Sequence, residues 1–338
     1  MIRIPGKVMI CGEYAVLRGG WSLLSPVPRY LYVEERRQEE VPLHPRPAPK
    51  CDVDDPAVTP PPDDGGGGGR PAEGSGERSP VIDAALREPV PELAEFEREH
   101  GLPDPCIDRR ELRGRGEEGR DLKLGLGSSA AECVGVIALR YQRAGRRWQS
   151  RRREVMAHAL AAHERAQGGR GSGADVAVCA MEEPIAFRRA DAGIEIDPWR
   201  PAVPMTLVWT ERSADTRGRV AQFERYLASG GETAGSLLAD VIAAGDVLAE
   251  TLRSVPGASG WKDRLDEYLE RISTLMAAAG IDYVPPAYEK VAAWARDHGL
   301  RVKPTGAGGG DMLLLIGDIP PNVMASCPLR SHVVIPLS

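Results

Sequence analysis

The chain has 338 residues, of which 42% are hydrophobic and 27% are charged, and its 43 basic and 49 acidic residues give a net charge of −6. This length predicts two domains, or one large domain of two lobes, with a core that needs no disulfide bonds. The acidic balance argues against a general nucleic-acid binder, so an anionic ligand would have to be met by local positive groups.

The sequence also carries no sign of export or of membrane insertion. No run of 18 apolar residues occurs, and the first residues lack the pattern of a secretory signal. The six cysteines are scattered without a Cys-x-x-Cys pair, which argues against a zinc site or a disulfide framework. We therefore expect a cytoplasmic protein that does not bind membranes, as a monomer or a homodimer.

In chain order, the first elements are two extended segments. Residues 2–11 are expected to form a strand that is interrupted at Pro5-Gly6, and residues 21–34 a second strand. The segment 39–80 is rich in proline, glycine and aspartate and cannot bury enough apolar surface to offset its ordering entropy. We interpret it as a mobile insertion within a domain. Helical spacing resumes over residues 81–99.

The rest of the chain alternates between helical and extended patterns. A buried helix is expected at 128–144 and another helix at 151–166, followed by strands at 185–189 and 204–210. Helices at 233–253, 261–279 and 286–298 and strands at 312–316 and 333–337 complete the pattern. This order predicts an α+β fold of two lobes, which we place at residues 1–190 and 191–338.

Three glycine clusters mark the candidate functional regions. The first is Pro5-Gly6-Lys7, which leads to a tight turn at Gly12; the third is the run from Lys303 to Asp311, where glycines permit close approach of the backbone. The second, Leu124-Gly125-Leu126-Gly127-Ser128-Ser129-Ala130-Ala131, opens a helix and offers bare N–H groups to an anion. It is not the common P-loop, and its match to a dinucleotide fingerprint lacks the acidic residue about 20 positions on.

One acidic residue stands out between these clusters. Asp175 follows a Gly-Ser-Gly turn and opens an apolar stretch, where it is either a simple helix cap, or a general base or electrostatic partner for a lysine. His158 and His163 are five residues apart and so do not share a helix face, which argues against a metal pair.

The three clusters, in this order and at these distances, resemble the galactokinase–homoserine kinase–mevalonate kinase–phosphomevalonate kinase (GHMP) superfamily. The resemblance covers residues 2–337 apart from the insertion. It implies a two-lobed α+β fold, with an N-lobe like domain 2 of ribosomal protein S5 and a ferredoxin-like C-lobe. It also implies ATP as the phosphoryl donor, Mg²⁺ as the metal and a small-molecule acceptor.

The resemblance assigns roles to particular residues. Lys7 and Asp175 would be catalytic, Lys7 by stabilising charge on the transferring phosphoryl group and Asp175 by orienting the attacking oxygen. Ser129, or Ser128, and Glu164 would hold Mg²⁺, since Glu164 lies eleven residues before Asp175 as in mevalonate kinases. ATP would be bound by Lys123, Gly125, Leu126, Gly127, Ser128, Ser129 and Ala130. The acceptor would be bound by Arg170, Ser172, Gly173, Arg212, Gly306, Ala307 and Gly308, with Lys303 as a further candidate cation.

Two stretches resemble phosphomevalonate kinases more narrowly, namely 166–177 and 208–216. Glu211 and Asp215 replace a usual glycine and serine there, and Met181-Glu182-Glu183 replaces a usual Gly-Gly turn. We therefore expect a kinase that converts 5-phosphomevalonate to 5-diphosphomevalonate. The alternatives are a kinase for mevalonate, homoserine or a sugar, a catalytically silent regulator of the same fold, and a nicotinamide-dependent enzyme.

Overall fold

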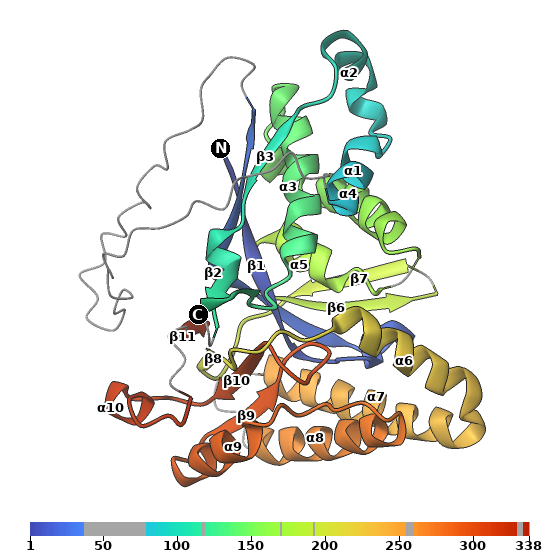
Figure 1. Cartoon of the computed structure of the whole chain (residues 1–338). Helices are drawn as coiled ribbons and strands as arrows, with labels where there is room; N and C mark the ends of the chain where they lie inside the picture. Colours follow the sequence, from blue (N-terminus) through green and yellow to red (C-terminus); the bar gives the residue numbers. More distant parts are fainter. Residues whose placement is uncertain are drawn as a thin grey trace.

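An antiparallel sheet of five strands forms the centre of the N-terminal lobe (Figure 1). Its strand order is β1-β2-β6-β7, and β3 pairs with β2. The strands are β1 (Ile2–Cys11), β2 (Ser22–Glu35), β3 (Pro105–Asp108), β6 (Ile185–Ala190) and β7 (Gly193–Pro198). The structure, a computed structural model, describes residues 1–36, 79–116, 119–169, 171–191, 193–254, 260–329 and 334–337. The predicted insertion at 39–80 therefore lies almost wholly outside the described residues.

Strand β1 is continuous, although the sequence predicted an interruption at Pro5-Gly6. Its pairing with β2 shifts register between Pro5 and Gly6, which is the bulge that these two residues require. The strand lies at the edge of the sheet, where a proline is tolerated because the missing N–H need not face a neighbour. The strand thereby carries Lys7 toward the region described below.

Helices α3 and α5 pack on this sheet and contact β1 and β2 directly, while α1 and α4 pack against these two helices as a further layer. The four helices are α1 (Pro80–Arg87), α3 (Ser128–Arg143), α4 (Arg152–Ala166) and α5 (Ala174–Met181). Helix α3 is buried at every position from Ala130 to Tyr141. Gly135 permits this close packing, because a Cβ at that position would lie 2.6 Å from Cγ2 of Val33 on β2.

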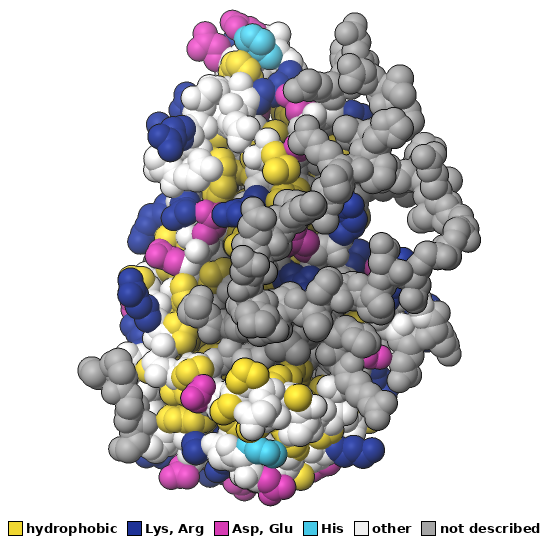
Figure 2. All heavy atoms as spheres, turned by 90° about the vertical axis from the view of Figure 1, so that its left-hand side faces the viewer, with side chains coloured by type: hydrophobic (Ala, Val, Ile, Leu, Met, Phe, Trp, Pro, Cys, Tyr) yellow, Lys and Arg dark blue, Asp and Glu magenta, His cyan; other side chains and the backbone are white. Residues whose placement is uncertain are grey.

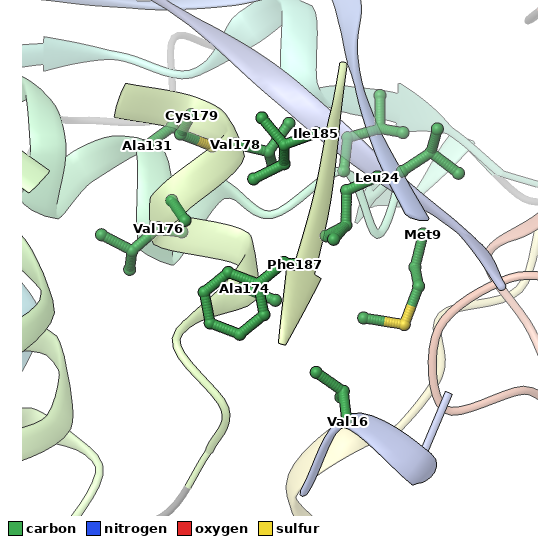
Figure 3. Close-up of a cluster of buried hydrophobic side chains, with 14 of the residues drawn as sticks. Met9, Val16, Leu24, Ala131, Ala174, Val176, Val178, Cys179, Ile185 and Phe187 are labelled. Carbon is green, nitrogen blue, oxygen red and sulfur yellow. The ribbon is translucent and has the colours of Figure 1, made fainter. Parts of the chain in front are cut away.

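Helix α5 is short but strongly apolar. In Figure 3 the side chain of Val178 lies beside Ile185 of β6, with Phe187 of β6 and Leu24 of β2 near it, and Val176 points to the other side of the helix. All five are fully buried. This packing fixes α5 against the sheet and so fixes the position of its second residue, Asp175.

The C-terminal lobe contains a second antiparallel sheet with strand order β11-β8-β10-β9. Its strands are β8 (Met205–Trp209), β9 (Arg301–Pro304), β10 (Met312–Ile316) and β11 (Val334–Leu337). The helices of this lobe in the described residues are α6 (Thr216–Ser229), α7 (Gly231–Arg253), α8 (Trp261–Ala278), α9 (Tyr288–Asp297) and α10 (Pro321–Met324). The predicted helices at 233–253, 261–279 and 286–298 are confirmed as α7, α8 and α9.

Strand β10 serves two hydrophobic cores with its two faces. Met312, Leu314 and Ile316 join the large core that also contains residues of β1, α3 and α8. Leu313 and Leu315 join a smaller core with α9, which includes Val291, Trp294 and Ala295. The alternation is the two-residue period of a strand buried on both faces. The large core therefore runs through both lobes and holds them together.

The structure corrects several sequence expectations. The predicted helix at 81–99 is two helices, α1 and α2 (Ala94–His100), because Pro91 follows a break at Glu88–Val90 and begins a short 3₁₀ helix. Strands β3, β7 and β9 were not predicted. Because β7 pairs with β6 in the first sheet, we propose that the boundary between the lobes follows Pro198 instead of residue 190.

The chain presents a mixed charged surface on the face that Figure 2 draws, where basic and acidic side chains are interspersed among the coloured residues. Within the described residues, no helix combines the length and the apolar character that crossing a membrane requires. Two short strands, β4 (Arg113–Arg115) and β5 (Asp121–Lys123), form a separate ribbon that leads into α3.

Candidate active site

The second glycine cluster forms a loop between β5 and α3, which we call the cradle loop (residues 124–127). Gly125 and Gly127 both adopt positive φ angles, of 74° and 76°, and alternate with the buried side chains of Leu124 and Leu126. Gly127 is the N-cap of α3, and no side chain of the described residues caps this helix. The first α-helical bond runs from Ala131 N–H to Gly127, which leaves the amides of residues 128–130 without a helical acceptor. These amides and the helix dipole favour an anion.

Lys7 lies next to this loop and is joined to it through the backbone. Its N–H donates to the carbonyl oxygen of Leu126 at 2.9 Å. Its side chain also packs on the loop, since a Cβ on Gly127 would lie 2.7 Å from both Cγ and Cε of Lys7. Gly127 is therefore needed both for its backbone conformation and for the space that Lys7 occupies.

The ammonium group of Lys7 forms an ion pair with Asp175, with Nζ 3.2 Å from Oδ2. Lys7 is only 8% exposed. Burial by itself lowers the pKa of Lys7, but the charge and hydrogen bond of the Asp175 carboxylate outweigh burial, and the pKa is raised above its ordinary value. Lys7 is thus a firmly charged ammonium at neutral pH.

A sharp turn places Asp175 on the first turn of α5. Gly173, the N-cap of α5, has a φ of 84°, and the hydroxyl of Ser172 accepts a hydrogen bond from Ala174 N–H at 3.2 Å. A Cβ on Gly173 would lie 2.4 Å from Cδ2 of Leu160, so the turn packs closely against α4 and leaves no room for a larger residue. Arg170, which the sequence predicted to bind the acceptor, lies outside the described residues.

The third glycine cluster is a loop before β10, which we call the C-lobe glycine loop (residues 305–311). Tyr14 of the N-lobe donates its hydroxyl hydrogen to the carbonyl oxygen of Ala307 at 3.0 Å. Gly309 N–H donates to the carbonyl oxygen of Tyr283 at 2.6 Å, and the Arg219 guanidinium donates to Gly308. The loop that contains Gly306, Ala307 and Gly308 is thus held by both lobes.

Asp311, at the end of this loop, reaches the cradle loop. A Cβ on Gly125 would lie 2.3 Å from its carboxyl carbon, and its Oδ1 accepts a hydrogen bond from Ala214 N–H at 3.1 Å. Burial raises the pKa of Asp311, while that hydrogen bond and the charges of Lys7, Arg219 and Lys123 act in the opposite direction. Asp311 belongs to a glycine motif of the sequence, but nothing in the spacing of that motif predicts its contact with Gly125.

The serine and glutamate expected to hold a metal have different neighbours. Ser129 Oγ lies 3.2 Å from Nε2 of His163, whose pKa is lowered by burial. Glu164 forms an ion pair with Arg189 at 3.4 Å, in which both side chains are about 40% exposed. The sequence did not single out His163 as a neighbour of the cradle. His158 instead lies beside Glu88 and Glu92, so the two histidines do not form a metal pair.

These oxygen donors fit Mg²⁺ in chemical type. In phosphoryl-transfer enzymes the ion usually takes one or two protein oxygens and completes its shell with phosphates and water. The Ser129 hydroxyl fits that role as it stands, whereas the Glu164 carboxylate fits it once released from Arg189. Among the described residues, no group of three or more histidine, cysteine, aspartate or glutamate side chains is arranged to hold a metal.

Of the described cations that were expected near the acceptor, two are exposed and one is buried. Lys123 and Arg212 have exposed side chains, and the charge of Lys123 acts on Asp311, which contacts the cradle loop. Two further cations, Arg217 and Arg219 of α6, were not predicted from the sequence. The charge of Arg217 lowers the pKa of His163, and the charge of Arg219 lowers the pKa of Asp311. The expectation for Lys303 is wrong: this side chain is fully buried and forms an ion pair with Glu13.

Comparison with solved structures gives matches that cover almost the whole chain. The Lin0012 protein from Listeria innocua matches with a TM-score of 0.70 and 20% identity, covering 99% of this chain and 98% of that chain. Streptococcus pneumoniae phosphomevalonate kinase, in complex with phosphomevalonate and AMPPNP, matches with a TM-score of 0.60 and 17% identity, covering 99% of both chains. Mevalonate kinase from L. major, in complex with R-mevalonate, matches with a TM-score of 0.57 and 15% identity, covering 100% of this chain and 96% of that chain.

The chain has the fold of the GHMP kinases. The two-lobed α+β architecture that the sequence predicted is thereby confirmed. No protein-family model matches the sequence, and no curated protein matches it. The likeness that the comparisons show thus lies in the fold.

The same fold removes one of the alternatives. A Rossmann-type dinucleotide site requires parallel strands joined by a helix, with the glycine-rich turn after the first strand. All strand pairings in the described residues of this GHMP fold are antiparallel, and the strand before the cradle loop belongs to a two-stranded ribbon. The interpretation of residues 125–130 as a nicotinamide-binding fingerprint is therefore wrong.

Proposed function

We propose that the chain is an ATP-dependent small-molecule kinase whose acceptor is 5-phosphomevalonate and whose product is 5-diphosphomevalonate. The observation that carries the kinase proposal is the joint position of three groups. Lys7 donates its N–H to the cradle loop while its ammonium group pairs with Asp175 at 3.2 Å. An anion-binding helix start, an ammonium and a carboxylate therefore lie side by side, which is the set that phosphoryl transfer needs.

In this proposal the cradle loop and the first amides of α3 hold the phosphates of ATP. Ser129, and Glu164 if released from Arg189, would hold Mg²⁺, which would supply positive charge to those phosphates. Lys123 adds positive charge from the neighbouring ribbon. Since this catalysis relies mainly on position and charge, the fixed amides contribute without reorganisation during the reaction.

The acceptor oxygen attacks the γ-phosphorus, and the bond from that phosphorus to the bridging oxygen of ADP breaks. Lys7 stabilises the charge on the attacking oxygen and the transferring phosphoryl group, which its raised pKa permits at neutral pH. Asp175 orients the attacking group and takes its proton where one is present. A phosphate acceptor is largely ionised at pH 7, so Asp175 then acts mainly by position.

The choice of 5-phosphomevalonate rests on two supports of different kinds. The stretches 166–177 and 208–216 resemble phosphomevalonate kinases, and one solved structure with this fold is a phosphomevalonate kinase in complex with phosphomevalonate. Cations near the cradle, among them Lys123, Arg212 and Arg217, suit an anionic acceptor on a chain of net charge −6.

An ATP-consumption assay with mevalonate and 5-phosphomevalonate side by side tests the proposal. We expect rapid ADP release with 5-phosphomevalonate and little with mevalonate. Turnover with mevalonate, homoserine or a sugar instead would support the assignment as a kinase but contradict 5-phosphomevalonate as its acceptor. ATP binding without turnover on any acceptor would favour a catalytically silent regulator.

A further inference from the structure

Asp311 is joined to the loop between β8 and α6 (residues 210–215) by hydrogen bonds that the proposed reaction does not use. Its N–H donates to the carbonyl oxygen of Arg212 at 2.6 Å, and its carbonyl oxygen accepts from both the N–H and the hydroxyl of Thr210 at 2.8 Å. Its carboxylate Oδ1 accepts from Ala214 N–H at 3.1 Å. The backbone and the side chain of Asp311 therefore both hold the loop that carries the exposed side chain of Arg212.

The other carboxylate oxygen of Asp311 faces the cradle loop. A Cβ on Gly125 would lie 2.5 Å from Oδ2, so the carboxylate fills the space beside that glycine. The β8–α6 loop also lies close to the ribbon that leads to the cradle loop, because a Cβ on Gly116, which follows β4, would lie 3.4 Å from the carbonyl oxygen of Glu211. Asp311 thus connects the β8–α6 loop with the cradle loop through the two oxygens of one carboxylate.

The backbone conformation of Asp311 shows that its side chain is not needed for the turn itself. Its φ of 56° lies in the left-handed region, which Gly306, Gly308 and Gly309 adopt earlier in the same loop. Glycine reaches this conformation without steric cost, whereas an aspartate pays for its Cβ. Residues held in this region are common at binding and catalytic sites, where their surroundings fix them. The contacts of the carboxylate on both sides supply such a reason here.

We propose that Asp311 is a positioning residue that holds Arg212 beside the cradle loop, so that a phosphate-bearing acceptor is bound next to the phosphates of ATP. The planar guanidinium of an arginine matches the oxygens of a phosphate group, provided that its backbone is fixed at the right place. Asp311 fixes that backbone without touching the acceptor. The inference rests on the proposed function, in which Arg212 binds the acceptor.

Two variants separate the backbone of Asp311 from its side chain. Asp311→Gly retains the left-handed conformation and loses the carboxylate, whereas Asp311→Asn retains an oxygen that can accept from Ala214 N–H. Hydrogen–deuterium exchange of the free protein, followed by mass spectrometry, measures the protection of residues 210–218. We expect exchange there to be about tenfold faster in Asp311→Gly and close to that of the natural protein in Asp311→Asn. Unchanged exchange in Asp311→Gly would overturn the proposal.

Steady-state kinetics test the positioning itself. Asp311→Gly should lower kcat/KM for 5-phosphomevalonate by about tenfold or more, because Arg212 is no longer aligned with the cradle loop. Its affinity for AMPPNP, measured by isothermal titration calorimetry, should change little, since the N–H of Lys7 holds the cradle loop separately through Leu126. Asp311→Asn should recover most of the loss. Equal losses in both variants, no loss in Asp311→Gly, or a loss confined to AMPPNP would contradict the proposal.

A double-mutant cycle tests whether Asp311 acts through Arg212. In Arg212→Ala the cation is absent, so adding Asp311→Gly should cause little further loss in kcat/KM for the acceptor. A full additional loss would overturn the proposal. If the unaltered protein phosphorylates neither 5-phosphomevalonate nor another acceptor, the proposed function fails and this inference with it. If it phosphorylates 5-phosphomevalonate and Asp311→Gly does so equally well, only the inference fails.

Discussion

Lys7 is the residue on which the candidate site is assembled. Its backbone, its methylene groups and its ammonium each contact a different part of the site, namely Leu126, Gly127 and Asp175. The sequence showed only a lysine on a strand near a glycine, which is usually a solvated residue. The long-range contacts that give it a role come from the fold, and spacing along the chain does not encode them.

The ion pair gives the first prediction. Lys7→Met should lower kcat by about 10²-fold or more, because a charge aimed at the transferring phosphoryl group is lost. Asp175→Asn should also lower kcat strongly while it keeps an oxygen near the ammonium. Steady-state kinetics with 5-phosphomevalonate and ATP measure both, and circular dichroism checks the fold. Near-normal turnover in either variant would remove that residue from the mechanism.

Asp311 gives a prediction about how the stability of the protein depends on pH. Its pKa in the folded protein is raised, mainly by burial, so the folded state binds the proton more tightly than the unfolded state does. Stability from this group is therefore greatest at low pH and is lost as pH rises through the folded pKa. Asp311→Asn keeps an acceptor for Ala214 N–H without the charge. It should be more stable than the natural protein at pH 7.

The advantage of Asp311→Asn should shrink as the pH falls through the raised pKa of Asp311, below which the natural side chain is protonated as well. Urea unfolding at a series of pH values, without nucleotide or metal, measures the difference in unfolding free energy. A variant that is less stable than the natural protein by the same amount at every pH would contradict the assignment of a raised pKa.

At the scale of elements, the junction of the cradle loop with α3 is the part that the sequence predicted best. Gly127→Ala should weaken AMPPNP binding by about tenfold, since the added Cβ meets Lys7 and the position requires a positive φ. Isothermal titration calorimetry measures the affinity. Gly145→Ala is the matched control, because Gly145 also has a positive φ of 72° but open space around it. It should lose stability and keep its affinity for AMPPNP.

The ends of two elements carry glutamates where the resemblance leads one to expect glycine. Glu182, the C-cap of α5, has a φ of 57°, and Glu211, after β8, has a φ of 60°. The backbone thus retains the left-handed turns that glycine usually provides, although the side chains have changed. The two glutamates therefore add local backbone strain, but they do not change the direction of the backbone at these turns.

Glu182 allows that strain to be measured. Glu182→Ala and Glu182→Gly both remove the ion pair with Arg152, but only the glycine relieves the left-handed conformation. We expect Glu182→Gly to be about 1 kcal/mol more stable than Glu182→Ala in urea unfolding. Equal stabilities would show that the turn relaxes in the alanine variant.

At the scale of the whole molecule, the lobes are joined by a buried charged network. Lys303 pairs with Glu13, and the other carboxylate oxygen of Glu13 accepts from the Tyr268 hydroxyl at 2.8 Å. Tyr268 also accepts from Gly12 N–H at 3.1 Å. The network links the turn after β1 to α8 and β9. The sequence could not reveal it, because Glu13 and Lys303 are 290 residues apart.

Breaking this network on one side should be costly. Lys303→Met leaves Glu13 buried without its cation, and we expect a loss of about 3–5 kcal/mol in unfolding free energy. The double variant Glu13→Leu/Lys303→Met removes both charges and should lose distinctly less than Lys303→Met alone. Chemical denaturation measures both. A double variant that is less stable than Lys303→Met would indicate that the charges themselves hold the lobes together.

The lobes and the longer elements could be predicted from the sequence, because apolar periodicity and glycine clusters are local signals. The helices at 233–253, 261–279 and 286–298 follow directly from such patterns. The short strands β3, β7 and β9 escaped prediction because polar residues and prolines break up their apolar pattern, whereas β8 and β10 are as short but almost wholly apolar. The partners of Asp311, His163 and Lys303 escaped it because each contact joins segments that are distant in the chain.

The pairing of Lys7 with Asp175 has a consequence for how an anion would reach the site. Each charge of the pair is compensated by the other, so the pair exerts little attraction on an approaching ligand. Capture from solution then depends on the exposed cations around it, Lys123, Arg212 and Arg217. Raising the ionic strength should therefore slow the association of an acceptor, because salt screens these three exposed charges. The rate of the chemical step at the buried Lys7 should depend much less on added salt.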